Sequence, residues 1–87
     1  MYLQENAQVQ KPGRRVEHVV TELRGATAHY EPVDDPARQF KTGATTLAQN
    51  LRITVAELVG SRFSCWVEPV EYGVFRTDFR LVAQSDA

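Results

Sequence analysis

Two stretches near the C-terminal end of the chain alternate between apolar and polar side chains, and they constrain the fold more than any other feature. The stretches span residues 62–70 and 74–82. Side chains at every second position of a strand point to the same face, so the alternation predicts two strands, each with one buried face. The predicted buried face carries Phe63, Cys65, Val67, Phe75, Thr77, Phe79 and Leu81.

A short segment that ends in Gly73 joins the two predicted strands and sets their register. A three-residue loop places Phe63 opposite Leu81 on the buried face. The same loop places Glu68 opposite Arg76 on the outer face. A two-residue loop would mix the two faces, and Gly73 suits the left-handed third position of a three-residue loop, so the sequence predicts the longer loop.

Length and charge limit the classes of protein that the chain can belong to. The 87 residues are enough for one domain with a thin core, and small proteins often gain stability by associating with copies of themselves. The formal net charge is −1, so strong non-specific attraction to nucleic acid is not expected. A homo-oligomer is therefore one expectation for this chain.

The single cysteine, Cys65, lies on the predicted buried face and cannot form an intramolecular disulfide. One buried thiol is typical of a reducing compartment. The first residues lack the basic and apolar regions of a signal peptide, and no apolar run reaches the roughly 20 residues of a membrane span. The sequence therefore predicts a cytoplasmic protein with no membrane partner.

The residues before Gly25 predict a helix. An apolar stripe at helix spacing is formed by Val16, Val19, Val20 and Leu23. Glycine is common directly after the last residue of a helix. The pattern predicts an amphipathic helix over Arg14–Arg24, with a strand as the competing prediction because its three valines lower the helix propensity.

The next part of the chain predicts a short strand and a short helix. Alternation over residues 26–33 indicates a strand that ends at Pro32. Asp35 is a plausible N-cap and Pro36 a plausible first helical residue, so a helix of one or two turns follows until Gly43 ends it.

Residues 44–60 allow two interpretations. As one helix, they carry an apolar stripe of Leu47, Leu51, Val55 and Leu58. As a helix over 45–50 followed by a strand over 51–59, they end in a two-residue turn at Gly60-Ser61. We favour the second interpretation because glycine at the first central position suits a type II′ turn.

These elements together predict an α+β fold in a single domain at residues 14–83. A flexible arm at 1–13 precedes the domain, and a tail at 84–87 follows it. The N-terminal amphipathic helix packs on a three-stranded antiparallel sheet of residues 51–59, 62–68 and 74–82.

A second interpretation rests on residues 47–58. Ala48 matches the small residue where two helices cross, and Thr54 matches the cap of a second helix. The core positions are matched by Leu51, Ile53 and Leu58. The segment resembles the helix-turn-helix of bacterial repressors, although Arg52 stands where the turn usually has glycine. The resemblance implies a winged helix as the alternative fold and a DNA-binding transcriptional regulator as the alternative function.

Trp66 on the predicted outer face is the strongest surface feature. Trp and Arg are enriched in interface hot spots, and a Trp–Arg stack is favourable. The predicted protein-interface site consists of Trp66, Glu68, Arg76, Asp78 and Arg80. In the alternative interpretation, the arm or a helix covers Trp66.

No group of side chains predicts catalysis or a cofactor. His18 and His29 have no Cys, Asp or Glu at metal-ligand spacing. Asp34 and Asp35 adjoin a proline, so helix capping explains them better than acid–base chemistry. The leading expectation is a small non-catalytic interaction or regulatory module, not an enzyme, which contacts a protein partner or a second copy of itself.

Overall fold

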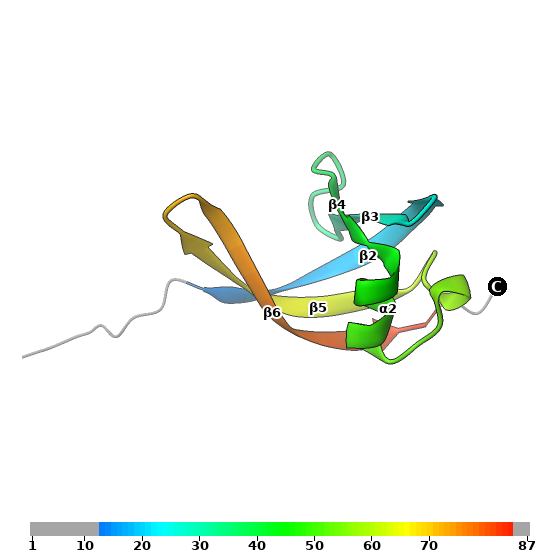
Figure 1. Ribbon diagram of the computed structural model, residues 1–87. Helices are drawn as coiled ribbons and strands as arrows, with labels where there is room; N and C mark the ends of the chain where they lie inside the picture. The colour runs from blue at the N-terminus through cyan, green and yellow to red at the C-terminus, as the bar shows by residue number, and fades with distance from the viewer. Residues whose placement is uncertain (1–12, 85–87) are drawn as a thin grey trace, which may run out of the picture.

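The computed structural model describes residues 13–84, which form five antiparallel strands curled into a half-barrel with one short α-helix (Figure 1). The strands are β2 (Arg14–Arg24), β3 (Thr27–Pro32), β4 (Phe40–Gly43), β5 (Arg62–Val70) and β6 (Gly73–Ala83). Their order in the sheet is β4-β3-β2-β5-β6. The predicted α+β fold, with an N-terminal helix on three strands, is therefore wrong. The predicted arm and tail lie, apart from Gly13 and Gln84, outside the described residues.

β2 is a strand where the apolar spacing predicted a helix, and a bulge explains the error. Val20 lies opposite Tyr30 and Glu22 lies opposite His29, so Thr21 is an extra residue in β2. A bulge of this kind brings residues three apart onto one face. Val20 is buried and Leu23 packs on the same core, so the spacing of three residues imitates a helix.

The segment before the helix also differs from the prediction. β3 forms as predicted and ends at Pro32. Asp35 and Pro36 do not begin a helix. The backbone N–H of Asp35 instead donates to the carbonyl of Pro32 at 3.2 Å, and a pair of turns leads into β4. Pro36 is compatible with a turn as well as with a helix start, so tertiary pairing of β4 with β3 decided the outcome.

The predicted helix over residues 45–50 is confirmed as α2 (Ala44–Leu51), but the strand predicted after it is wrong. Arg52 adopts a left-handed conformation, with φ of 62°, and ends the helix. Thr54 and Glu57 then form a capping box at a three-residue 3₁₀ turn, η1 (Val55–Glu57). The winged-helix alternative is wrong as well, because no second helix of recognition length follows α2 in residues 52–84.

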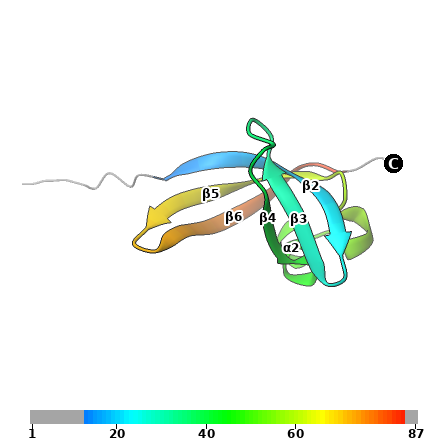
Figure 2. The same cartoon turned by 90° about the horizontal axis from the view of Figure 1, so that it is seen from above.

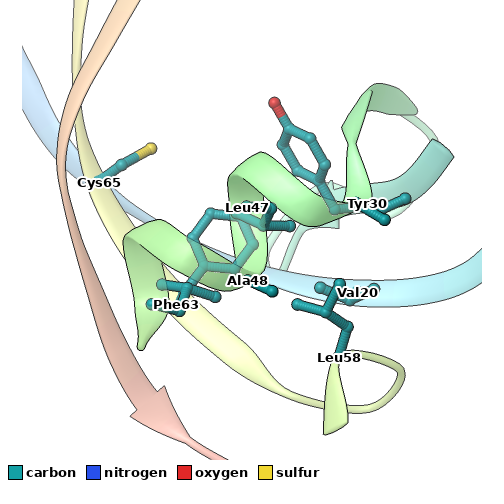
Figure 3. Close-up of a cluster of buried hydrophobic side chains, with 10 residues drawn as sticks. Val20, Tyr30, Leu47, Ala48, Leu58, Phe63 and Cys65 are labelled. Atoms are coloured by element: carbon teal, nitrogen blue, oxygen red, sulfur yellow. The ribbon is translucent and has the colours of Figure 1, made fainter. Parts of the chain in front are cut away.

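The hydrophobic core lies between α2 and the concave face of the sheet. α2 packs its buried residues Leu47 and Ala48 among Val20, Phe63 and Leu58, as Figure 3 shows. Burying such side chains is the main driving force for folding, at roughly 25 cal/mol per Å² of apolar surface. α2 therefore covers one end of the half-barrel, and Figures 1 and 2 show that the tip of the β5–β6 hairpin lies at the other end.

The β5–β6 hairpin has the predicted pairing at its base and a different pairing at its tip. Phe63 lies opposite Leu81, as predicted, and Phe63 is fully buried. The loop, however, has two residues, because Val70 lies opposite Gly73. The predicted three-residue loop is therefore wrong, although Gly73 does adopt a positive φ of 135°.

A β-bulge at Asp78 reconciles the short loop with the correct pairing at the base. Ser64 lies opposite Arg80 and Trp66 lies opposite Thr77, so β6 holds one extra residue between these pairs. Asp78 has a φ of 54°, a left-handed value that marks this irregularity. Every side chain of β6 between the bulge and the tip consequently points to the face opposite to the predicted one.

The exchange of faces has two consequences for the surface. Arg76 lies opposite Val67 on the concave face, so its predicted position on the outer face opposite Glu68 is wrong. Phe75 takes that outer position, and 55% of its surface is exposed. The sequence had predicted Phe75 to be buried, so the bulge replaces an apolar side chain with a cation inside the half-barrel.

We predict that Phe63→Ala lowers the free energy of unfolding by about 3–5 kcal/mol, because it removes a fully buried ring. Phe75→Ala is the matched control in the same hairpin, and we expect a change of about 0.5 kcal/mol or less. Urea melts followed by the fluorescence of Trp66 measure both values. Equal losses for the two variants would contradict the assignment of faces.

We predict that Asp78→Val destabilises the protein by about 1–3 kcal/mol more than Asp78→Gly does. A β-branched residue resists the positive φ at this position, whereas glycine adopts it freely. Both variants lose the same carboxylate, so the difference between their urea melts isolates the backbone conformation. Tolerance of valine equal to that of glycine would mean that the bulge does not exist.

Candidate functional site

The end of the half-barrel that α2 leaves uncovered holds a small open cleft of about 100 Å³. All five strands and the turns between β3 and β4 supply its walls. Three arginines reach the cleft: Arg14 from β2, Arg38 from the turn segment and Arg76 from β6. The cleft is therefore the place where cationic side chains from distant parts of the sequence meet.

The Phe40 ring contacts two of these arginines. The guanidinium carbon of Arg76 is 4.4 Å from the centre of the Phe40 ring, and that of Arg38 is 5.2 Å from the same point. Arg76 also lies 6.0 Å from the centre of the Tyr30 ring. Aromatic faces attract cations, so these contacts hold the planar Arg76 guanidinium in place without neutralising it.

The cleft gathers arginines that have no carboxylate partner. Of the eight arginines in the sequence, Arg15, Arg24, Arg62 and Arg80 form ion pairs with carboxylates. Among the described residues no ion pair joins Arg14, Arg38 or Arg76 to a carboxylate, although Asp34 and Asp35 also line the cleft. The cleft thus presents cationic groups that remain available to an anion.

Arg76 has a further unmet requirement. Its Nε atom is buried and has no hydrogen-bond acceptor among the described residues. A buried donor without an acceptor costs about 1–3 kcal/mol, and more when the group is charged. Such groups are uncommon in native structures, where ordered water or an ion usually supplies the acceptor. The guanidinium of Arg76 is therefore suited to an acceptor from outside the chain.

His18 forms the floor of the cleft and is uncharged at neutral pH. Its ring stacks on Phe63 with centroids 5.3 Å apart and contacts Tyr30 edge-on at 5.2 Å. Burial and the nearby charge of Arg76 lower the pKa of His18 from 6.5 to about 4. The positive charge in the cleft at neutral pH therefore comes from the arginines alone.

Cys65 lies beside His18 but lacks the properties of a nucleophile. Its Sγ atom is 3.9 Å from His18 Nδ1, and the thiol is fully buried. Burial raises the pKa of the Cys65 thiol, whereas a reactive cysteine needs a lowered pKa and access to substrate. The contact is that of two neutral core side chains, as predicted for Cys65.

The other residues of the predicted interface site lie on the convex face, away from the cleft. Trp66 is partly buried. Its indole N–H donates to Glu68 Oε2 at 2.9 Å, and the ring packs against the backbone of Gly13. Arg80 pairs with Asp78 at 2.9 Å. The predicted site is thus divided, with Arg76 on the concave face and the other four residues on the convex face.

The convex face also carries the contacts that hold the bulge. Arg15 pairs with the carboxylate of Asp78, and its Nη1 donates to Ser64 Oγ at 2.8 Å and to the Asp78 carbonyl at 3.2 Å. Because Arg15 comes from β2, these bonds tie the edge strand β6 across β5 to the centre of the sheet. The arginines Arg15 and Arg80 on the convex face therefore have a carboxylate partner, whereas the described partners of Arg38 and Arg76 in the cleft are aromatic rings.

The tip of the β5–β6 hairpin exposes apolar side chains next to the cleft. The exposed apolar residues at the tip are Val70, Tyr72, Val74 and Phe75, and 91% of the surface of Tyr72 is accessible. Val74 also lines the cleft. Contiguous apolar surface beside unpaired charge is typical of protein–protein contact sites.

Comparison of the chain with protein-family models, with curated proteins and with solved structures finds no match in any of the three. Within residues 13–84, no group of three or more His, Cys, Asp or Glu side chains could hold a metal ion. The same residues contain no helix long and apolar enough to cross a membrane. The geometry of the cleft is therefore the basis for assigning a function.

Sequence reasoning found Arg76 but missed the residues that surround it. Arg14 belongs to the cleft because β2 is a strand, and the helix prediction hid that position. Arg38 and Phe40 carry no local pattern that distinguishes them. Only the pairing of Phe40 with Tyr30 across β4 and β3 brings them to the concave face.

We predict that the protein loses stability as the pH falls from 6.5 to 4, because the unfolded chain binds a proton at His18 that the folded chain excludes. The unfolded state then holds more protons, so stability rises with pH across this window and is complete above it. The pKa of His18 falls from 6.5 in the unfolded chain to about 4 in the folded protein, which corresponds to a change in the free energy of unfolding on the order of 3 kcal/mol.

The variant His18→Phe keeps an aromatic ring beside Phe63 and removes the titrating group. Urea melts at several pH values should show a flatter pH dependence for this variant than for the wild type. Identical pH profiles would show that His18 titrates in the folded protein as it does in the unfolded chain.

Proposed function

We propose that this protein is a non-catalytic binding module that holds an acidic segment of a partner protein in the cleft at the open end of its half-barrel. The observation that carries the proposal is that three arginines line the cleft with no ion pair to a carboxylate among residues 13–84, and that two of them, Arg38 and Arg76, contact the Phe40 ring. A carboxylate is the group that completes this arrangement, because an arginine can donate two parallel hydrogen bonds to it.

The size and charge of the site favour a carboxylate over a polyphosphate chain. A volume of about 100 Å³ accepts a small group such as the end of a Glu or Asp side chain. Asp34 and Asp35 at the cleft wall would repel a run of closely spaced phosphates. The formal net charge of −1 adds no long-range attraction for nucleic acid.

The exposed hairpin tip supports a protein as the source of the carboxylate. Tyr72 and Phe75 offer apolar surface at the tip of the β5–β6 hairpin, and Val74 of the same tip lines the cleft. Aromatic side chains contribute strongly to protein interfaces. Charge in the cleft and apolar contact at the tip together suit a peptide segment. Self-association and DNA binding stay predictions from the sequence.

We predict that a synthetic eight-residue peptide in which Glu alternates with Thr binds the wild-type protein, and that Arg76→Gln weakens binding by about tenfold or more. One charge-assisted hydrogen bond is worth about 1.5–3 kcal/mol, and 1.4 kcal/mol is a factor of ten. Arg76→Lys keeps the charge but loses the planar donor pair, so an intermediate affinity is expected. Fluorescence anisotropy of labelled peptide measures all three.

Two controls make the result specific. Arg52→Lys changes an arginine that also has no ion pair within residues 13–84 but lies at the end of α2, outside the cleft, and should leave the affinity unchanged. A peptide with Gln in place of Glu should not bind. Equal affinity of wild type and Arg76→Gln for the Glu peptide, with unchanged thermal melts, would contradict the proposed function.

Binding should also be visible at His18. A carboxylate bound to Arg76 offsets the charge that lowers the pKa of His18, so the pKa should rise in the complex. NMR titration of the His18 ring with and without the Glu peptide measures this shift. A pKa of His18 that is unchanged at saturating peptide would place the peptide outside the cleft.

A further inference from the structure

The N-terminal part of β2 has a strand neighbour on only one side. β5 pairs with β2 from Arg14 to Val19, whereas β3 begins to pair only at His18, opposite Pro32. The last backbone hydrogen bond on the β3 side runs from the N–H of Val33 to the carbonyl of Glu17, at 2.9 Å. The chain then turns away, so residues 14–17 of β2 present an open edge among the described residues.

The direction of the backbone groups along this edge follows from the neighbouring bonds. Val20 bonds toward the β5 side, because its N–H donates to the Ser61 carbonyl at 3.0 Å. Glu17 bonds toward the β3 side. Backbone groups of successive residues point to opposite sides of a strand. The N–H and C=O of Arg15 therefore point to the open edge, and those of Arg14 point to β5.

A groove of about 240 Å³ lies along the open edge. Its walls include Arg15 and Glu17 on one side and Val33 on the other. Arg14, Val16 and Asp34 line both this groove and the arginine cleft. An extended segment lying in the groove would therefore have the cleft directly beneath its inward-pointing side chains.

We infer that the acidic segment of the partner binds as an added β-strand along residues 14–17 of β2, with alternate Asp or Glu side chains directed into the arginine cleft. This inference rests on the proposed function and specifies how the segment is held. Added strands gain affinity from backbone hydrogen bonds and specificity from alternate side chains. Here the backbone of Arg15 supplies the hydrogen bonds, and the cleft with Arg76 supplies the specificity for acidic side chains.

The charge of the groove agrees with this occupant. Arg14 and Arg15 lie along the open edge, and of the two carboxylates that line the groove, Glu17 and Asp34, Glu17 is paired with Arg62 at 3.4 Å. Alternating acidic and neutral residues match a strand with one face on the cleft and one face in solvent. A segment that places acids on both faces would bring carboxylates close to Glu17, which lines the groove from the convex side, and should bind less well.

The test uses the Glu–Thr peptide with its backbone amides methylated in two alternate sets. One peptide carries N-methyl groups at the Glu positions and the other at the Thr positions. Successive amides of a strand point to opposite sides, so only one set faces β2. We expect one methylated peptide to lose affinity by about tenfold or more, relative to the other, by fluorescence anisotropy.

The set that weakens binding also reports the direction of the added strand, because reversing the strand exchanges the two sets of amides. Equal affinity of both methylated peptides and the parent peptide would overturn the added strand. If Arg76→Gln still abolished binding in that case, the proposed function would stand without it. Loss of the Arg76 dependence would instead contradict the proposed function itself.

A second measurement follows the protein. Hydrogen exchange of the Arg15 amide should slow by about tenfold or more when the Glu–Thr peptide is saturating, because this amide gains an acceptor. The Arg14 amide, which already points to β5, is the control and should change little. Equal protection factors for Arg15 in the free and bound protein would overturn the inference.

Discussion

The ion pair between Arg15 and Asp78 holds the feature on which the rest of the half-barrel depends. Asp78 has a left-handed backbone conformation that β-strands do not normally contain. Arg15 of β2 forms an ion pair with its carboxylate and donates a hydrogen bond to its carbonyl. Backbone strain persists only where surrounding contacts compensate for it. This bulge turns Arg76 onto the concave face, where it stacks on Phe40. A contact on the convex side thus determines the charge on the concave side.

The two ends of the half-barrel differ because one short helix covers only one of them. α2 buries Leu47 and Ala48 against the sheet and completes a conventional apolar core. At the other end Phe40 packs beside the Tyr30 ring, and its own ring also contacts the guanidinium groups of Arg38 and Arg76. Stability is concentrated at the helix end, and unsatisfied hydrogen-bonding capacity is concentrated at the hairpin end. This separation allows the cleft to hold charge without endangering the core.

Local alternation in the sequence was reliable where strands are regular and misleading where they bulge. The buried face of β5 with Phe63 and Cys65 follows directly from period two. The bulge at Thr21 gave β2 a spacing typical of helices, and the bulge at Asp78 reversed the predicted face of Arg76. Each bulge is defined by how a strand pairs with the neighbouring strand of its hairpin, and the alternation within one strand does not encode it. The convex location of Trp66 was accessible from the sequence, but the cleft was not.

The position of the Arg76 side chain tests the account most directly. In a nuclear Overhauser experiment on the free protein, the Arg76 side-chain protons should give cross-peaks to the Phe40 ring, and stacking should shift their resonances upfield. Cross-peaks from Arg76 to the Trp66 indole, with none to Phe40, would place Arg76 on the convex face. That result would remove the bulge at Asp78 and the arginine cleft together.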